Sequence, residues 1–86
     1  MRIRVTLTGR SYHLADGLPA AIELSDGGTI DDVLSDLSQR LGDDAPLPAT
    51  CLISVGGKHI GSVANHDNRA LADNDEVLLI APVAGG

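Results

Sequence analysis

The sequence predicts an α+β fold in which one main helix packs on one face of a mixed sheet of four to five strands. Three segments support this prediction. Residues 2–8 alternate between apolar and polar side chains, as a strand with one buried face does. Residues 30–41 place apolar side chains at helical spacing. Residues 77–81 are continuously apolar, which is typical of a strand buried on both faces.

The other strands are shorter and are separated by turn-forming residues. Residues 9–19 are rich in turn formers, so a loop is expected to join the first strand to a second at about 20–25. The β-rich run 51–55 and the short run 58–60 flank Gly56-Gly57. Because glycine accepts the positive φ of a tight turn, these two runs are predicted to form a hairpin.

The predicted helix has sequence signals at both of its ends. Thr29 is a residue type favoured at the N-cap, and Asp31 and Asp32 place negative charge at the positive end of the helix dipole. Arg40 lies in the last turn, and Gly42 follows where helices commonly end. With this helix in the crossover, the first and last strands are expected to be parallel neighbours, with the last strand central.

Length and composition limit the classes of function. The 86 residues have room for one hydrophobic core, and 43% of them are apolar. Residues 1–82 are expected to form one domain, and residues 83–86 a flexible tail. Twelve acidic against six basic residues give a net charge of −6, which argues against nucleic acid and anionic membranes as partners. No signal-type segment or apolar run of about 20 residues is present, so a cytoplasmic location is expected.

Few side chains suggest chemistry of their own. His13, His59 and His66 are widely spaced, with no second ligand at metal-site spacing, so no metal site is expected. Cys51 is the only cysteine and begins a β-rich run, so it is interpreted as a small core residue in preference to a nucleophile. The sequence shows no credible catalytic set within the chain.

Two segments, together with the order of elements, resemble the ubiquitin-like β-grasp family of sulfur carriers. Residues 71–77 (LADNDEV) are similar to the family's L-x-D-G-D-x-V turn, with Asn74 in place of the usual glycine. Residues 82–86 (PVAGG) are similar to tails of the same family. Members include the small subunit of molybdopterin synthase and the thiamine-pathway sulfur carrier. The resemblance covers the whole chain and implies a β-grasp fold.

The resemblance also implies where the chemistry takes place. It assigns it to the terminal carboxylate of Gly86, which is adenylated and then converted to a thiocarboxylate. The residues that the partner would recognise precede it: Pro82, Val83, Ala84 and Gly85. ATP and Mg²⁺ would be used by the activating partner, an adenylyltransferase like those that activate ubiquitin. The chain itself would bind no cofactor.

The residues of the tail suit this role for physical reasons of their own. Glycine lacks a side chain, so Gly85 and Gly86 would allow the tail to thread a narrow enzyme channel. At about 3.3–3.6 Å per extended residue, Pro82 to Gly86 would project roughly 15 Å from the domain. Pro82 and Val83 favour extended geometry, which would lower the ordering entropy on docking.

The pathway that receives the sulfur is left open by the sequence. The tail favours the molybdopterin-synthase small subunit, with the large subunit as partner, although the aromatic residues often found near the start of these subunits are missing. One alternative is a sulfur carrier for cysteine or thiamine biosynthesis, acting with another sulfur-accepting synthase. Another is a ubiquitin-like protein modifier joined to lysines through Gly86, and a third is a plain β-grasp interaction module.

Overall fold

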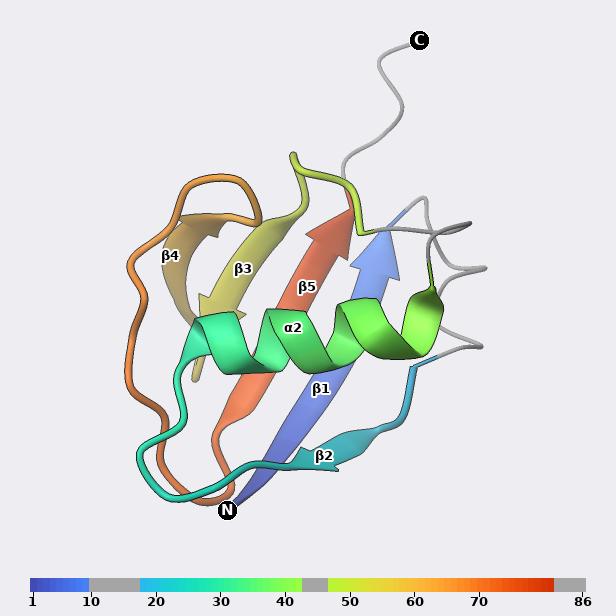
Figure 1. The fold of residues 1–86 in the computed structure, drawn as a ribbon. Helices are drawn as coiled ribbons and strands as arrows, with labels where there is room; N and C mark the ends of the chain where they lie inside the picture. The colour runs from blue at the N-terminus through green and yellow to red at the C-terminus, as the bar shows by residue number, and fades with distance from the viewer. Residues whose placement is uncertain (10–17, 43–46, 82–86) are drawn as a thin grey trace, which may run out of the picture.

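A five-stranded mixed sheet with one helix across one face is formed by residues 1–9, 18–42 and 47–81, which the computed structural model describes (Figure 1). The elements are, in chain order, β1 (Arg2–Gly9), β2 (Ala21–Glu23), α2 (Ile30–Leu41), β3 (Leu52–Val55), β4 (Lys58–Ser62) and β5 (Glu76–Ala81). The strand order β2-β1-β5-β3-β4 places β5 in the centre of the sheet. The predicted α+β class and central last strand are confirmed.

The first and last strands are parallel neighbours, as the sequence predicts. Their register runs from Arg4 opposite Glu76 to Gly9 opposite Ala81. Parallel strands cannot be joined by a tight turn and need a long crossover connection. Here the chain leaves β1 and returns to β5 through β2, α2 and the β3–β4 hairpin. The pairing of β1 with β5 therefore holds the first and the last strand of the domain side by side.

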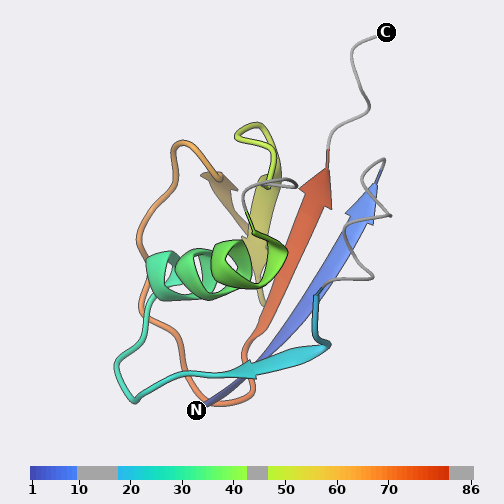
Figure 2. The same ribbon diagram turned by 45° about the vertical axis from the view of Figure 1, so that its right-hand side comes forward.

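One side of helix α2 faces the sheet and contributes to the hydrophobic core. Ile30, Val33 and Leu37 are fully buried, and Leu34 and Leu41 are half-buried at the margin. The sheet contributes fully buried side chains to the same core: Ile3, Ile53, Val77 and Leu79. Figure 2 shows the helix lying against one face of the sheet. Each such aliphatic side chain contributes about 1.5–3 kcal/mol through burial, so this contact is the main source of stability.

The two ends of α2 take the predicted forms. Thr29 is the N-cap residue, and its backbone N–H donates a hydrogen bond to Oδ2 of Asp32 at 2.9 Å. The backbone N–H of Asp31 donates to Oδ1 of Asn68 at 3.0 Å. These bonds satisfy groups that an isolated helix leaves unpaired. At the other end, Gly42 has a φ of 76°, and its backbone N–H donates a hydrogen bond to the carbonyl oxygen of Ser38 in the helix.

The strands near the sheet edges differ in length from the sequence prediction. β2 covers only Ala21–Glu23 within the predicted 20–25. β4 extends to Ser62, beyond the predicted end at residue 60, because the register shifts between Ile53 and Ser54. This irregularity lets Gly61 pair with Ile53, and Gly61 adopts a φ of 130°. The turn at Asn74, with a φ of 69°, has the predicted left-handed conformation.

Gly61 is predicted to be a position at which even alanine is poorly tolerated. A Cβ on Gly61 would overlap the carbonyl oxygen of Asn65 and lie 2.7 Å from Cα of His66. Gly57 also has positive φ, but a Cβ there meets nothing within 4 Å. We expect Gly57→Ala to cost about 1–2 kcal/mol from backbone strain alone, and Gly61→Ala to cost clearly more. Urea unfolding of both variants measures the difference, and equal costs would contradict the close packing at Gly61.

Candidate functional site

The chain leaves the folded domain at the end of the central strand. β5 ends at Ala81, which is 3% exposed and pairs with Gly9 of β1. The residues to which the sequence assigns recognition and chemistry follow directly, and they lie outside the described residues: Pro82, Val83, Ala84, Gly85 and Gly86. The structure therefore defines the position from which the tail starts, while the role of the tail stays a prediction.

The sheet face opposite α2 presents apolar side chains at this end of β5. Leu52 is 41% exposed and lies opposite Ile80 in the antiparallel register of β3 and β5. Leu78 lies two residues before Ile80 on the same side of β5, and both are half-buried. We call Leu52, Leu78 and Ile80 the open-face patch. It ends one residue before Ala81, so it is continuous with the start of the tail.

The open-face patch corrects the expectation that residues 77–81 are buried on both faces. Val77, Leu79 and Ala81 are buried under α2, whereas Leu78 and Ile80 are only half-buried. The reason is that the described residues place a helix on one face of the sheet only. A continuous apolar run in the central strand therefore serves two surfaces, the core and an accessible patch.

Polar residues of β1 border the open-face patch. Thr6 lies opposite Leu78, and Thr8 lies opposite Ile80. Nearer the start of β1, the guanidinium of Arg4 is 3.7 Å from the carboxylate of Glu76, with both side chains about half exposed. An exposed ion pair of this kind contributes little to stability. Apolar centre and polar border are the arrangement found at protein–protein contacts.

Cys51 lies in the core, as the sequence predicts. Its side chain is fully buried. Burial raises the pKa of the Cys51 thiol because it disfavours the thiolate, and a backbone hydrogen bond from Ile80 offsets part of this effect. The thiolate is the nucleophilic form of cysteine. Because the Cys51 thiol is buried and its pKa is raised, it is poorly suited to accept or transfer sulfur.

The three histidines have different surroundings. His13 lies outside the described residues, and His59 is exposed on β4. The ring of His66 is only 9% exposed and contacts Asp31. Among residues 1–9, 18–42 and 47–81, no three side chains of His, Cys, Asp or Glu are grouped so that they could bind a metal ion together.

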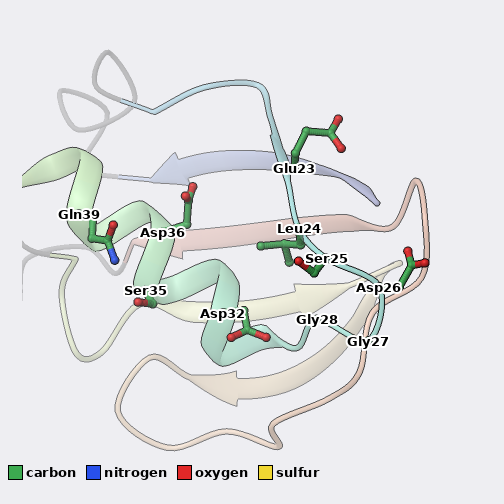
Figure 3. A pocket seen from close by; sticks show the side chains of 10 residues that line it. All are labelled: Glu23, Leu24, Ser25, Asp26, Gly27, Gly28, Asp32, Ser35, Asp36 and Gln39. Atoms are coloured by element: carbon green, nitrogen blue, oxygen red, sulfur yellow. The ribbon is translucent and has the colours of Figure 1, made fainter.

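A separate acidic hollow lies beside α2, far along the chain from β5. Its volume is about 440 Å³, and it is bordered by the β2–α2 connection and the outer side of the helix (Figure 3). Carboxylates of Asp26, Asp32 and Asp36 belong to its lining. Asp32 accepts the hydrogen bond from Thr29, and Asp36 pairs with Arg40 at 2.8 Å. No lining residue belongs to β5 or the open-face patch, so the hollow is separate from the start of the tail.

The fold and the comparisons define the class of protein. The mixed sheet with one helix is a ubiquitin-like β-grasp, and SAMP1 from Haloferax volcanii has the same fold, with a TM-score of 0.71 and 21% identity over 100% of both chains. The ThiS family matches residues 5–86, so the chain belongs to this family, and the predicted resemblance to sulfur carriers is confirmed. The chain is also 29% identical to a molybdopterin synthase sulfur carrier subunit from Chlamydomonas reinhardtii, over 100% of both sequences.

Helix α2 is 12 residues long, and among the described residues no helix is long and apolar enough to cross a membrane.

The open-face patch is the feature that sequence reasoning did not locate. Its signal was present in the alternation of Leu52 with the buried Ile53, but recognising it requires the register that places Leu52 beside Ile80.

Proposed function

We propose that this protein is a sulfur carrier whose Gly86 carboxylate is adenylated and then converted to a thiocarboxylate, and that it is the small subunit of a molybdopterin synthase. The observation that supports this most strongly is the ThiS-family match, which extends over residues 5–86 and so includes the Gly-Gly tail. The similarity to a molybdopterin synthase sulfur carrier subunit over its whole length favours this pathway.

The proposed chemistry begins with a carboxylate, which is a poor electrophile. Attack of the Gly86 carboxylate on ATP forms an acyl-adenylate and releases pyrophosphate. Hydrosulfide, supplied at the partner's site, then attacks the acyl carbon; the new C–S bond forms as the C–O bond to AMP breaks, and loss of the proton leaves the thiocarboxylate. An adenylyltransferase related to ubiquitin-activating enzymes supplies the site for ATP and Mg²⁺, and this chain supplies the carboxylate and the surface by which it is recognised.

The central strand provides a firm base for such a tail. β5 is hydrogen-bonded on both sides, to β1 over Glu76–Ala81 and to β3 over Val77–Ile80. Ala81 is therefore held in a fixed position. Five more residues, at about 3.3–3.6 Å each when extended, would carry the Gly86 carboxylate up to about 17 Å outward. This distance suffices for the carboxylate to enter a buried site while the domain remains outside.

The open-face patch is proposed to bind the activating adenylyltransferase. An enzyme that holds residues 82–86 in its active site must lie next to Ala81, and the patch begins at the neighbouring Ile80. Leu52 provides the exposed apolar side chain of this surface, at 41% exposure. Such a side chain gains free energy when a partner removes it from water. The net charge of −6 adds attraction to a partner with a basic surface.

The proposed chemistry predicts a change in mass that depends on the tail. Incubation with a cognate activating enzyme, ATP and a sulfur source should raise the intact mass by the difference between one sulfur and one oxygen atom. Deletion of Gly85-Gly86 should abolish the gain, while circular dichroism and the unfolding midpoint stay unchanged because the core ends at Ala81. Intact-protein mass spectrometry measures the gain. Absence of a gain with every cognate enzyme would contradict the proposal.

The docking surface predicts a selective defect in the Leu52→Asp variant. A carboxylate at the partner contact would be desolvated without compensation, so we expect KM for the activating enzyme to rise about tenfold or more, with kcat much less affected. Ser38→Asp, at an exposed position on α2, adds the same charge away from the patch and is the matched control. ATP–pyrophosphate exchange kinetics measure both. Equal KM values for the two variants would exclude the open-face patch from docking.

A further inference from the structure

The ring of His66 joins the segment after β4 to the beginning of α2. Its Nδ1 lies 2.8 Å from the backbone carbonyl oxygen of Ser62, and its Nε2 lies 2.8 Å from Oδ1 of Asp31. The His66 side chain is 9% exposed, whereas the Asp31 side chain is 60% exposed. Residues 31 and 66 are distant in sequence, so this contact ties two separate elements together.

The partners of the two ring nitrogens determine the protonation of His66. A backbone carbonyl oxygen only accepts hydrogen bonds, so Nδ1 must carry a proton to bond to Ser62. The ionised carboxylate of Asp31 also only accepts, so Nε2 must carry a proton as well. A neutral imidazole carries one ring proton and could satisfy only one of these contacts. Both hydrogen bonds are formed together only by the imidazolium.

We propose that His66 is an imidazolium at neutral pH and acts as a pH-sensitive clasp that holds residues 62–70 against the N-terminus of α2. Loss of one ring proton at higher pH leaves a nitrogen lone pair facing an acceptor oxygen. The clasp then opens, and the segment is held less firmly against the helix. The consequence is local, because the central strands and the core contacts of α2 do not depend on the ring.

The same segment supplies partners to the first turn of the helix. The backbone N–H of Ile30 donates to the carbonyl of Arg69 at 3.0 Å, and that of Asp31 donates to Oδ1 of Asn68 at 3.0 Å. These are N–H groups without partners inside the helix. Opening of the clasp therefore weakens the capping of α2 as well as the contact of His66.

The position of the ring is fixed by a tight backbone turn. The N–H of Ser62 donates to the carbonyl of Asn65 at 2.8 Å, and that of Asp67 donates to the carbonyl of Ile60 at 3.1 Å. Gly61 allows this close approach, because a Cβ there would lie 2.7 Å from Cα of His66. The turn thus holds the ring beside Ser62 and directs its other nitrogen toward α2.

The charges around the ring favour the proton. Burial of the ring lowers the pKa of His66, but the hydrogen bond to Asp31, the charge of Asp31 and the backbone contacts with Ser62 and Val63 together outweigh burial, so the pKa is raised above 6.5. Asp31 is the charged group of α2 that contacts the ring, and Ser62 of β4 contributes its backbone carbonyl oxygen. Asp67 and Arg69, the charged residues of the segment itself, have opposite signs.

Linkage determines the direction of the pH effect. Because the folded-state pKa of His66 lies above its unfolded value of about 6.5, the stabilisation is fully present below pH 6.5 and is lost as pH rises through the folded-state pKa. Asp31→Asn keeps an acceptor oxygen but removes the charge, so it should lower the titration midpoint of His66. The stability difference between the natural protein and Asp31→Asn should be larger at about pH 6 than at about pH 9.

Nitrogen-15 NMR of the ring tests the proposal directly. In the natural protein at pH 7 we expect both His66 ring nitrogens to show protonated shifts and the titration midpoint to lie above that of a peptide of residues 62–70. As the ring deprotonates, hydrogen-exchange protection of the Ile30 and Asp31 amides should fall, while that of Leu79 in β5 stays constant. His59→Gln, at an exposed histidine, is the matched control and should change neither. A neutral ring at pH 7, or constant protection at Ile30 and Asp31 through the titration, would overturn the clasp.

Discussion

The parallel pairing of β1 with β5 is the constraint on which the rest of the structure depends. The register from Arg4 opposite Glu76 to Gly9 opposite Ala81 brings the start and the end of the domain together in the middle of the sheet. A parallel pair requires a crossover, and the helix within that crossover covers one sheet face and closes the core. The opposite face keeps Leu78 and Ile80 accessible. The same pairing therefore determines the core, the open-face patch and the position from which the tail starts.

This arrangement separates the stability of the protein from its proposed chemistry. The proposed reactive group is a backbone carboxylate beyond Ala81, whereas the buried Cys51 thiol contributes to packing. Side chains that stabilise the domain thus need not be strained or exposed for function. In the proposed complex, recognition would be distributed over an accessible surface, because a partner that binds the tail would also cover the neighbouring patch. The ThiS-family match over residues 5–86 spans both parts.

The sequence predicted the features that depend on local periodicity. The alternation in residues 2–8, the helical spacing after Thr29 and the apolar run after Asp75 identified β1, α2 and β5, and Asn74 adopts the expected left-handed turn. Features that depend on register were not predictable in the same way. The extension of β4 to Ser62 follows from an irregularity opposite β3, and the burial of His66 follows from a close backbone approach at Gly61. The order of apolar and polar residues within one segment contains no information on either of these contacts between segments.

The most direct measurement concerns the position of the carboxylate itself. A variant with one alanine added after Gly86 keeps the whole tail sequence and the folded domain but moves the carboxylate by one residue. We expect ATP-dependent thiocarboxylate formation, read by intact mass, in the natural chain and none in the extended one, with identical unfolding midpoints. Undiminished sulfur loading of the extended chain would contradict the assignment of the chemistry to the Gly86 carboxylate.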